Sequence, residues 1–264
     1  AHPLEEGGCR VRRLGPAAFA LRPNARRRPG VSEEGIPPGG SRFWIRLRNR
    51  GRRPAAVRLR VDWECADRTL HHDFGYIRHE RDADWRLVPA ARRGAVVDYR
   101  LAIAPGVTDV ALTPEYGYGD CAVFVQEAAA AGAQVQILGR SRAGRAIWSL
   151  RFVSPHRRAG WFFVQARDHA YESSGSYAME GIARFLASKD PLAGHVRGKF
   201  HVCLVPMTNP DGVHDGMSRL TWERGADMNR VHTAADPAHR ALRAAIDAAR
   251  PFVHMNLHNW TDKF

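Results

Sequence analysis

The chain has 264 residues, enough for one large hydrophobic core or two modest ones, and its 44% hydrophobic and 25% charged residues exclude wholesale disorder. It contains no run of about 18 apolar residues, so we expect no membrane-spanning helix, and its first residues show no signal-peptide pattern. Its four cysteines are scattered and form no CxxC pair, which argues against a cysteine zinc site.

The charge of the chain is strongly positive. The formal net charge is +13, and 37 of the 40 basic residues are arginine. Such a balance is typical of proteins that bind nucleic acid or acidic substrates. The arginines, however, stand in small groups such as 26–28 and 52–53, without a nucleic-acid-binding motif, and GC-rich genomes also produce arginine-rich compositions. We therefore expect no nucleic-acid partner, while an acidic substrate stays open.

Residues 1–115 have the character of a β-rich domain. Segments 42–50 and 55–63 alternate apolar and basic residues, which predicts strands with one solvent-exposed face. Gly51 between them favours a hairpin. We expect an antiparallel, β-sandwich-like domain, with an irregular loop at 23–40 and further strands at 85–88, 96–102 and 107–112.

Residues 116–264 alternate strand and helix patterns instead. The continuous apolar run 161–166 predicts a strand that is buried on both faces. We expect a mixed, mostly parallel sheet covered by helices, an α/β/α arrangement. Its predicted strands are 134–138, 146–152, 161–166, 199–205 and 252–257, and its predicted helices are 120–131, 173–188 and 236–249.

Potential metal ligands follow two of these strands. His169 and Glu172 are three residues apart just after the strand 161–166, so both side chains can converge in a turn that enters a helix. His258 closes the last predicted strand, 86 residues after Glu172, and His254 is its competitor. Open α/β sheets place their sites at the carboxyl ends of strands, and two histidines with one glutamate suit a catalytic zinc ion.

Further motifs occur in order between these ligands. They are N-P-D-G-V at 209–213, an arginine at 219 and D-x-N-R at 227–230. Together with H-x-x-E at 169–172 and L-H at 257–258, they make residues 114–264 resemble the zinc metallocarboxypeptidases, specifically the cytosolic carboxypeptidase branch. That branch carries a sandwich-like domain before its catalytic domain, which agrees with the β-rich first part of this chain.

The resemblance implies a role for each matching residue. His169, Glu172 and His258 would bind one zinc ion per chain, and Arg219 would stabilise the developing oxyanion. Asn229 and Arg230 would hold the terminal carboxylate of a peptide or protein substrate, and the positive charge of the chain leaves an acidic substrate open. The expected activity is hydrolysis of the C-terminal peptide bond, and the expected location is the cytoplasm.

The family also implies a glutamate general base and a tyrosine, both well downstream of the last zinc ligand. We expect both beyond Phe264 and expect the chain to be the first part of a longer protein. Two alternatives stay open. One is a zinc amidohydrolase that resembles aspartoacylase or succinylglutamate desuccinylase, and the other is a non-catalytic zinc-binding interaction module.

Overall fold

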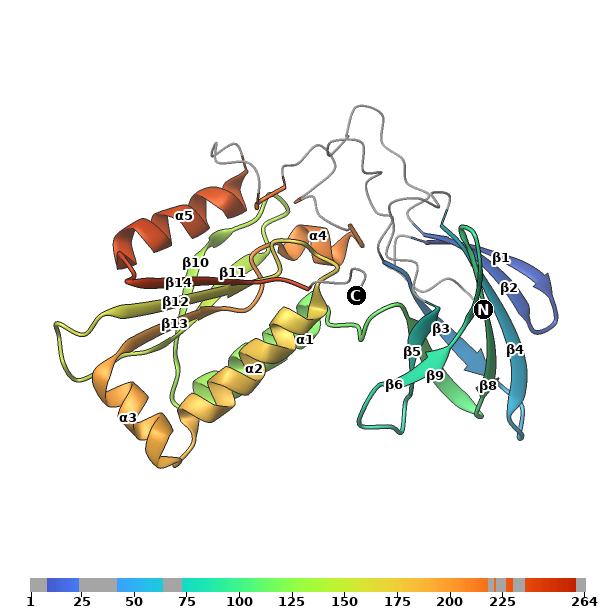
Figure 1. Cartoon of the computed structure of the whole chain (residues 1–264), viewed down its shortest axis with the longest axis horizontal. Helices are drawn as coiled ribbons and strands as arrows, with labels where there is room; N and C mark the ends of the chain where they lie inside the picture. The colour runs from blue at the N-terminus through green and yellow to red at the C-terminus, as the bar shows by residue number, and fades with distance from the viewer. Residues whose placement is uncertain are drawn as a thin grey trace. The chain divides into compact units, whose positions relative to one another are not determined.

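The computed structural model describes residues 9–23, 42–63, 73–217, 221, 227–229 and 236–259. The chain divides into two compact units, with the boundary between Glu115 and Tyr116. A short segment after His214 is grouped with the first unit. The first unit is built of strands, and the second combines strands with helices (Figure 1). Within the described ranges, no helix is both long and apolar enough to cross a membrane.

The described part of the first unit contains two β-sheets. One has the order β1 (Cys9–Gly15), β2 (Ala18–Pro23), β4 (Ala55–Asp62), β8 (Val96–Ile103) and β7 (Ala91–Arg93). The other has the order β3 (Trp44–Asn49), β9 (Gly106–Ala111), β5 (Phe74–His79) and β6 (Arg86–Pro89). The pairing of β2 with β4 is parallel, so the expected antiparallel arrangement holds for the other pairs but not for this one.

The predicted hairpin of segments 42–50 and 55–63 is wrong, because β3 and β4 lie in different sheets. Leu47 of β3 and Leu59 of β4 belong to one shared hydrophobic core. The apolar residues of the two alternating segments are therefore buried where two sheets pack face to face, and the two strands do not pair with each other. Most of the predicted loop at 23–40 lies outside the described residues.

The second unit contains a mixed five-stranded sheet, as predicted, within the described residues. Its order is β10 (Gln134–Arg140), β11 (Ala146–Phe152), β13 (His201–Val205), β12 (Trp161–Ala166) and β14 (Val253–Leu257). β12 runs parallel to β13 and β14, whereas the pairs β10–β11 and β11–β13 are antiparallel. The helices are α1 (Tyr118–Ala130), α2 (Ser173–Ala187), α3 (Pro191–Lys199), α4 (Pro210–His214) and α5 (Pro237–Ala249).

Helices cover both faces of this sheet because its central strands bury alternate residues in two cores. Val164 of β12 and Leu204 of β13 pack in the core that includes residues of α1 and α2. Phe163 and Cys203, which alternate with them, pack in the core that includes residues of α5. Figure 1 shows α5 on one side of the strands and α1 and α2 on the other. The apolar run 161–166 thus forms the predicted strand buried on both faces.

The parallel strands bring three segments of the chain to one edge of the sheet. Ala166 at the end of β12 pairs with Leu257 at the end of β14, and Gln165 pairs with Val205 at the end of β13. His258 follows Leu257 directly. The residues that come after the three strands therefore meet at the carboxyl edge of the sheet, where α/β folds place their sites.

Candidate metal centre

A buried arginine organises the turn between β12 and α2. Arg167 has a left-handed backbone, with φ 67°, and is 1% exposed. Its guanidinium donates to the carbonyl oxygens of Ala170 at 2.7 Å and Tyr116 at 3.0 Å, and to Oγ of Ser176 at 3.4 Å. Burial lowers the pKa of Arg167 to about 10, which leaves it cationic at neutral pH. Because Ala170 lies in the turn and Ser176 in α2, the guanidinium fixes the turn to the helix.

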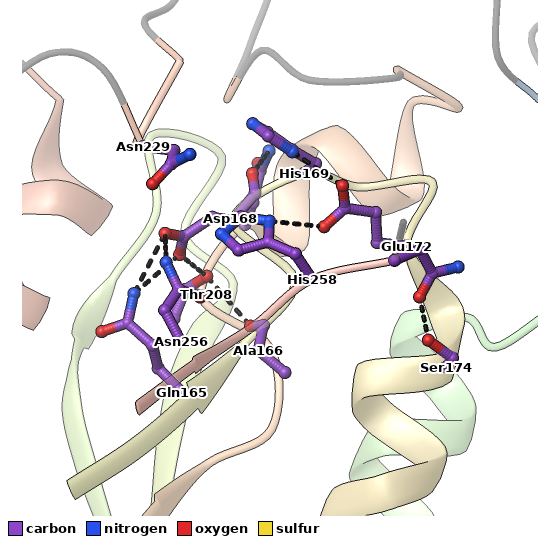
Figure 2. Close-up of polar contacts among 12 residues, drawn as sticks. Gln165, Ala166, Asp168, His169, Glu172, Ser174, Thr208, Asn229, Asn256 and His258 are labelled. Atoms are coloured by element: carbon purple, nitrogen blue, oxygen red, sulfur yellow. Dashed lines mark hydrogen bonds and ion pairs between the residues drawn. The ribbon is translucent and has the colours of Figure 1, made fainter. Parts of the chain in front are cut away.

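Three potential metal ligands converge beyond the strand ends (Figure 2). Nδ1 of His169 lies 2.8 Å from Oε1 of Glu172, and Nδ1 of His258 lies 2.7 Å from Oε2 of the same carboxylate. One ligand atom from each of the three residues lies within 4.8 Å of the other two. His169 and Glu172 are buried, whereas the His258 side chain is 25% exposed. The cluster is therefore accessible to solvent at His258.

A second carboxylate supports His169 from the far side of its ring. Nε2 of His169 lies 3.1 Å from Oδ1 of Asp227, which also accepts the backbone N–H of Asn229 at 2.9 Å. Burial lowers the pKa of His169, but the hydrogen bonds to Asp227 and Glu172 outweigh it and raise this pKa to about 9. Burial likewise raises the pKa of Glu172, and the hydrogen bonds from His169 and His258 outweigh that effect and lower it.

The donor atoms fit a zinc ion. Two imidazole nitrogens and one carboxylate form a common set for catalytic zinc, which keeps one position for water or substrate. Metal-bound histidines usually donate the other ring N–H to an outer partner, as His169 does toward Asp227. Nε2 of His258 is buried and has no such partner among the described residues. The described part of the chain thus provides three candidate ligands and one candidate outer partner.

The other predicted site residues fall in different places. Asn229 is exposed, and it is held near the cluster through its backbone contact to Asp227; Figure 2 includes its side chain in the same view as His169. Arg219 and Arg230 lie outside the described residues. His254, the competitor of His258, lies with Nε2 2.8 Å from Oε1 of Gln165 and is not part of the three-ligand group.

Sequence reasoning missed a polar network beside the ligands. The buried carboxylate of Asp168 accepts hydrogen bonds from Gln165, Thr208 and Asn256 (Figure 2). The backbone oxygen of Asp168 accepts from Nδ2 of Asn209 at 3.1 Å. The signal in the sequence is a set of polar residues at or shortly after the ends of strands, and which of them meet depends on how the strands pair.

The N-P-D-G-V segment shapes the neighbouring loop. Oδ1 of Asn209 accepts the backbone N–H of Gly212 at 2.9 Å. The buried Asp211 carboxylate accepts from Oγ of Ser141 at 2.6 Å and from Nη1 of Arg145 at 2.8 Å. Asp211 therefore ties α4 to the connection between β10 and β11.

Comparison with known families agrees with this fold and this cluster. The family model described as Zinc carboxypeptidase matches residues 124–255, which is half of the chain. The chain belongs to the zinc carboxypeptidase family. The match extends from within α1 into β14 and includes two of the three converging ligands, His169 and Glu172.

Similar curated proteins of this family carry the name cytosolic carboxypeptidase. Cytosolic carboxypeptidase 4 of Mus musculus is 45% identical over 67 residues, which is 25% of this chain and 6% of the mouse protein. Cytosolic carboxypeptidase 6 of Caenorhabditis elegans is 42% identical over 83 residues, which is 31% of this chain and 18% of the nematode protein. The matched segments thus span less than one fifth of these two relatives.

Solved structures share the fold over both units. A metallo-carboxypeptidase from Burkholderia cenocepacia superimposes with a TM-score of 0.84 at 24% identity, covering 99% of this chain and 70% of that one. A metallo-carboxypeptidase from Pseudomonas aeruginosa, in complex with (2-guanidinoethylmercapto)succinic acid, gives a TM-score of 0.80 at 19% identity over 99% of this chain and 70% of that one. At these identities the likeness concerns the fold.

Proposed function

We propose that this chain forms the zinc centre of a metallocarboxypeptidase that hydrolyses the C-terminal peptide bond of peptides or proteins. The observation that carries the proposal is the convergence of Nδ1 of His169 and Nδ1 of His258 on the two oxygens of Glu172. Membership of the zinc carboxypeptidase family supports the same chemistry.

The proposed roles follow from the donor atoms. His169, Glu172 and His258 hold one zinc ion per chain, and Asp227 orients His169 through its Nε2. A zinc ion bound there supplies a Lewis acid and lowers the pKa of a coordinated water molecule.

The substrate contacts are proposed from the family motif. Arg219 stabilises the negative charge that develops on the scissile carbonyl oxygen, and Arg230 holds the terminal carboxylate by paired hydrogen bonds. Asn229 assists Arg230. The position of Asn229 supports this role, because its backbone N–H is hydrogen-bonded to Asp227, the carboxylate that contacts His169. A fixed carboxylate-binding pair is the physical reason for cleavage at a free C-terminus only.

Metal analysis tests the ligand set. We expect about one zinc per chain in the purified protein and in His254→Ala, the matched control on the same strand. We expect loss of zinc in His169→Ala and in His258→Ala. A folded wild-type protein that binds no zinc, or zinc that survives both ligand changes, would contradict the proposed site.

Substrate tests separate the proposed reaction from its alternatives. Two peptides that differ only in a free or amidated C-terminus should be distinguished, with cleavage of the free form and inhibition by a chelator. Cleavage of N-acyl amino acids but not of peptides would indicate that the protein is a zinc amidohydrolase instead. Zinc binding without cleavage of either would indicate a non-catalytic module. Peptides ending in Glu, Leu or Lys would test whether the positive chain favours acidic ends.

A further inference from the structure

Asp168 is a buried carboxylate whose hydrogen bonds come from neutral side chains. It is 2% exposed. Oδ1 accepts from Oγ1 of Thr208 at 2.6 Å, Oδ2 accepts from Nδ2 of Asn256 at 2.7 Å, and Nε2 of Gln165 lies 3.0 Å from each oxygen. A buried charge is tolerated when its acceptor sites are filled, and filling them fixes the geometry of every donor.

The donors come from three different segments. Gln165 is the penultimate residue of β12, Asn256 is the penultimate residue of β14, and Thr208 follows β13. Gln165 and Asn256 are directly paired in the parallel register, so both side chains leave the sheet at the same level. The carboxylate of Asp168 therefore ties together the ends of the three parallel strands.

Two of these segments also carry proposed metal ligands. His169 directly follows Asp168, and His258 comes two residues after Asn256. The contact between Asp168 and Asn256 therefore joins the two segments that carry these histidines. The occupied acceptor sites and the burial of Asp168 leave no free, accessible oxygen for proton transfer to a substrate, so its effect is indirect.

We propose that Asp168 is a positioning residue for the metal centre, which holds the ends of β12 and β14 at the separation that lets His169 and His258 share one ion. This inference rests on the metal site proposed above. It also accounts for the orientation of Asn256, whose Oδ1 is buried without a hydrogen-bond partner among the described residues while its Nδ2 faces Asp168.

The direct contact permits an exchange experiment. Asp168→Asn places two amides opposite each other, and Asn256→Asp places two carboxylates opposite each other. The double variant D168N/N256D again pairs one amide with one carboxylate. Zinc affinity is measured by competition with a chromophoric chelator, and the coordination geometry is read from the visible absorption of the Co²⁺-substituted protein.

We expect D168N to weaken zinc binding by about tenfold or more and to change the Co²⁺ spectrum, as the loss of outer contacts does at other metal sites. N256D should also weaken binding, and the double variant should recover most of the affinity and the wild-type spectrum. Asp211→Asn is the matched control, because Asp211 is also buried, at 3% exposed, but contacts the β10–β11 connection. It should lower stability and leave the Co²⁺ spectrum unchanged.

Several outcomes would overturn the inference. A D168N protein with wild-type affinity and spectrum would do so while leaving the zinc site intact, and so would an equal spectral change in D211N. Failure of the double variant to recover would exclude the proposed pairing. If D168N does not fold, Asn256→Leu removes the donor on β14 with little change of size, and unchanged zinc affinity in it would also overturn the inference. Absence of metal binding in the wild type would instead overturn the proposed function.

Discussion

Nε2 of His169 lies 3.1 Å from Oδ1 of Asp227, on the opposite side of the ring from Glu172. This contact favours the tautomer in which Nε2 carries the proton and Nδ1 keeps a lone pair for a metal ion. The ring is thus held between two carboxylates. One of them, Glu172, shares the proposed metal, and the other only orients the ring.

Asp227→Asn should weaken zinc binding by about 10- to 100-fold, because the neutral amide orients the ring less strongly and makes its nitrogen less basic. Competition with a chelator measures the change. Asp247→Asn is the control, since this aspartate has 64% of its side chain exposed on α5 and pairs only with Arg243 among the described residues. Equal affinities in the two variants would contradict the role of Asp227.

The metal-free protein should lose stability as the pH rises. Its folded state raises the pKa of His169 from 6.5 to about 9 through Asp227 and Glu172. The stabilisation is therefore fully present below about pH 6.5 and disappears as the pH rises through about 9. Urea unfolding at a series of pH values measures it, and His169→Gln should flatten the profile in this window. A zinc ion competes with the proton that His169 loses in this pH range, so the affinity for zinc should rise between about pH 6.5 and 9.

Two glycines of α2 should respond oppositely to alanine. A Cβ at Gly175 would lie 2.9 Å from Cβ of Ala166 and 3.2 Å from the carbonyl oxygen of Leu257, the residue before His258. Gly175→Ala should therefore cost about 1–3 kcal/mol of stability and weaken zinc binding. Gly181→Ala meets no atom within 4 Å and should raise stability by up to about 1 kcal/mol. Thermal unfolding of both variants is the measurement, and a stable Gly175→Ala protein would contradict the close packing.

Arg167→Met should destabilise the protein by on the order of 2–5 kcal/mol. The change leaves the carbonyl oxygens of Ala170 and Tyr116 buried without their donor, at about 1–3 kcal/mol each. Urea unfolding in the presence of a chelator measures the cost without a metal contribution. Arg158→Met, at an exposed position in the loop before β12, should change stability by less than about 0.5 kcal/mol.

Much of the second unit could be predicted because its signals are local. The apolar run 161–166 and the spacing of His169 and Glu172 depend on a few neighbouring residues. α3 also has a clear local signal, although our prediction does not include this helix. Asp190 caps the helix by accepting from the backbone N–H of Leu192, and Pro191 occupies its first turn.

Other features depend on pairings between distant segments. The alternation in segments 42–50 and 55–63 identifies a buried face but not the sheet to which each strand belongs. The contact of Asp168 with Asn256 exists only because β14 lies beside β12. Nothing in the sequence near either residue specifies that pairing, so the network could not be predicted from it.

The parallel register of β12 and β14 has a consequence for the order of folding. His258 is 86 residues from Glu172 along the chain and reaches it only after β14 has docked. A nascent chain that has formed the turn at 167–172 can offer an ion two ligands at most. Tight metal capture should therefore be a late event, and its rate should report the docking of β14 against β12.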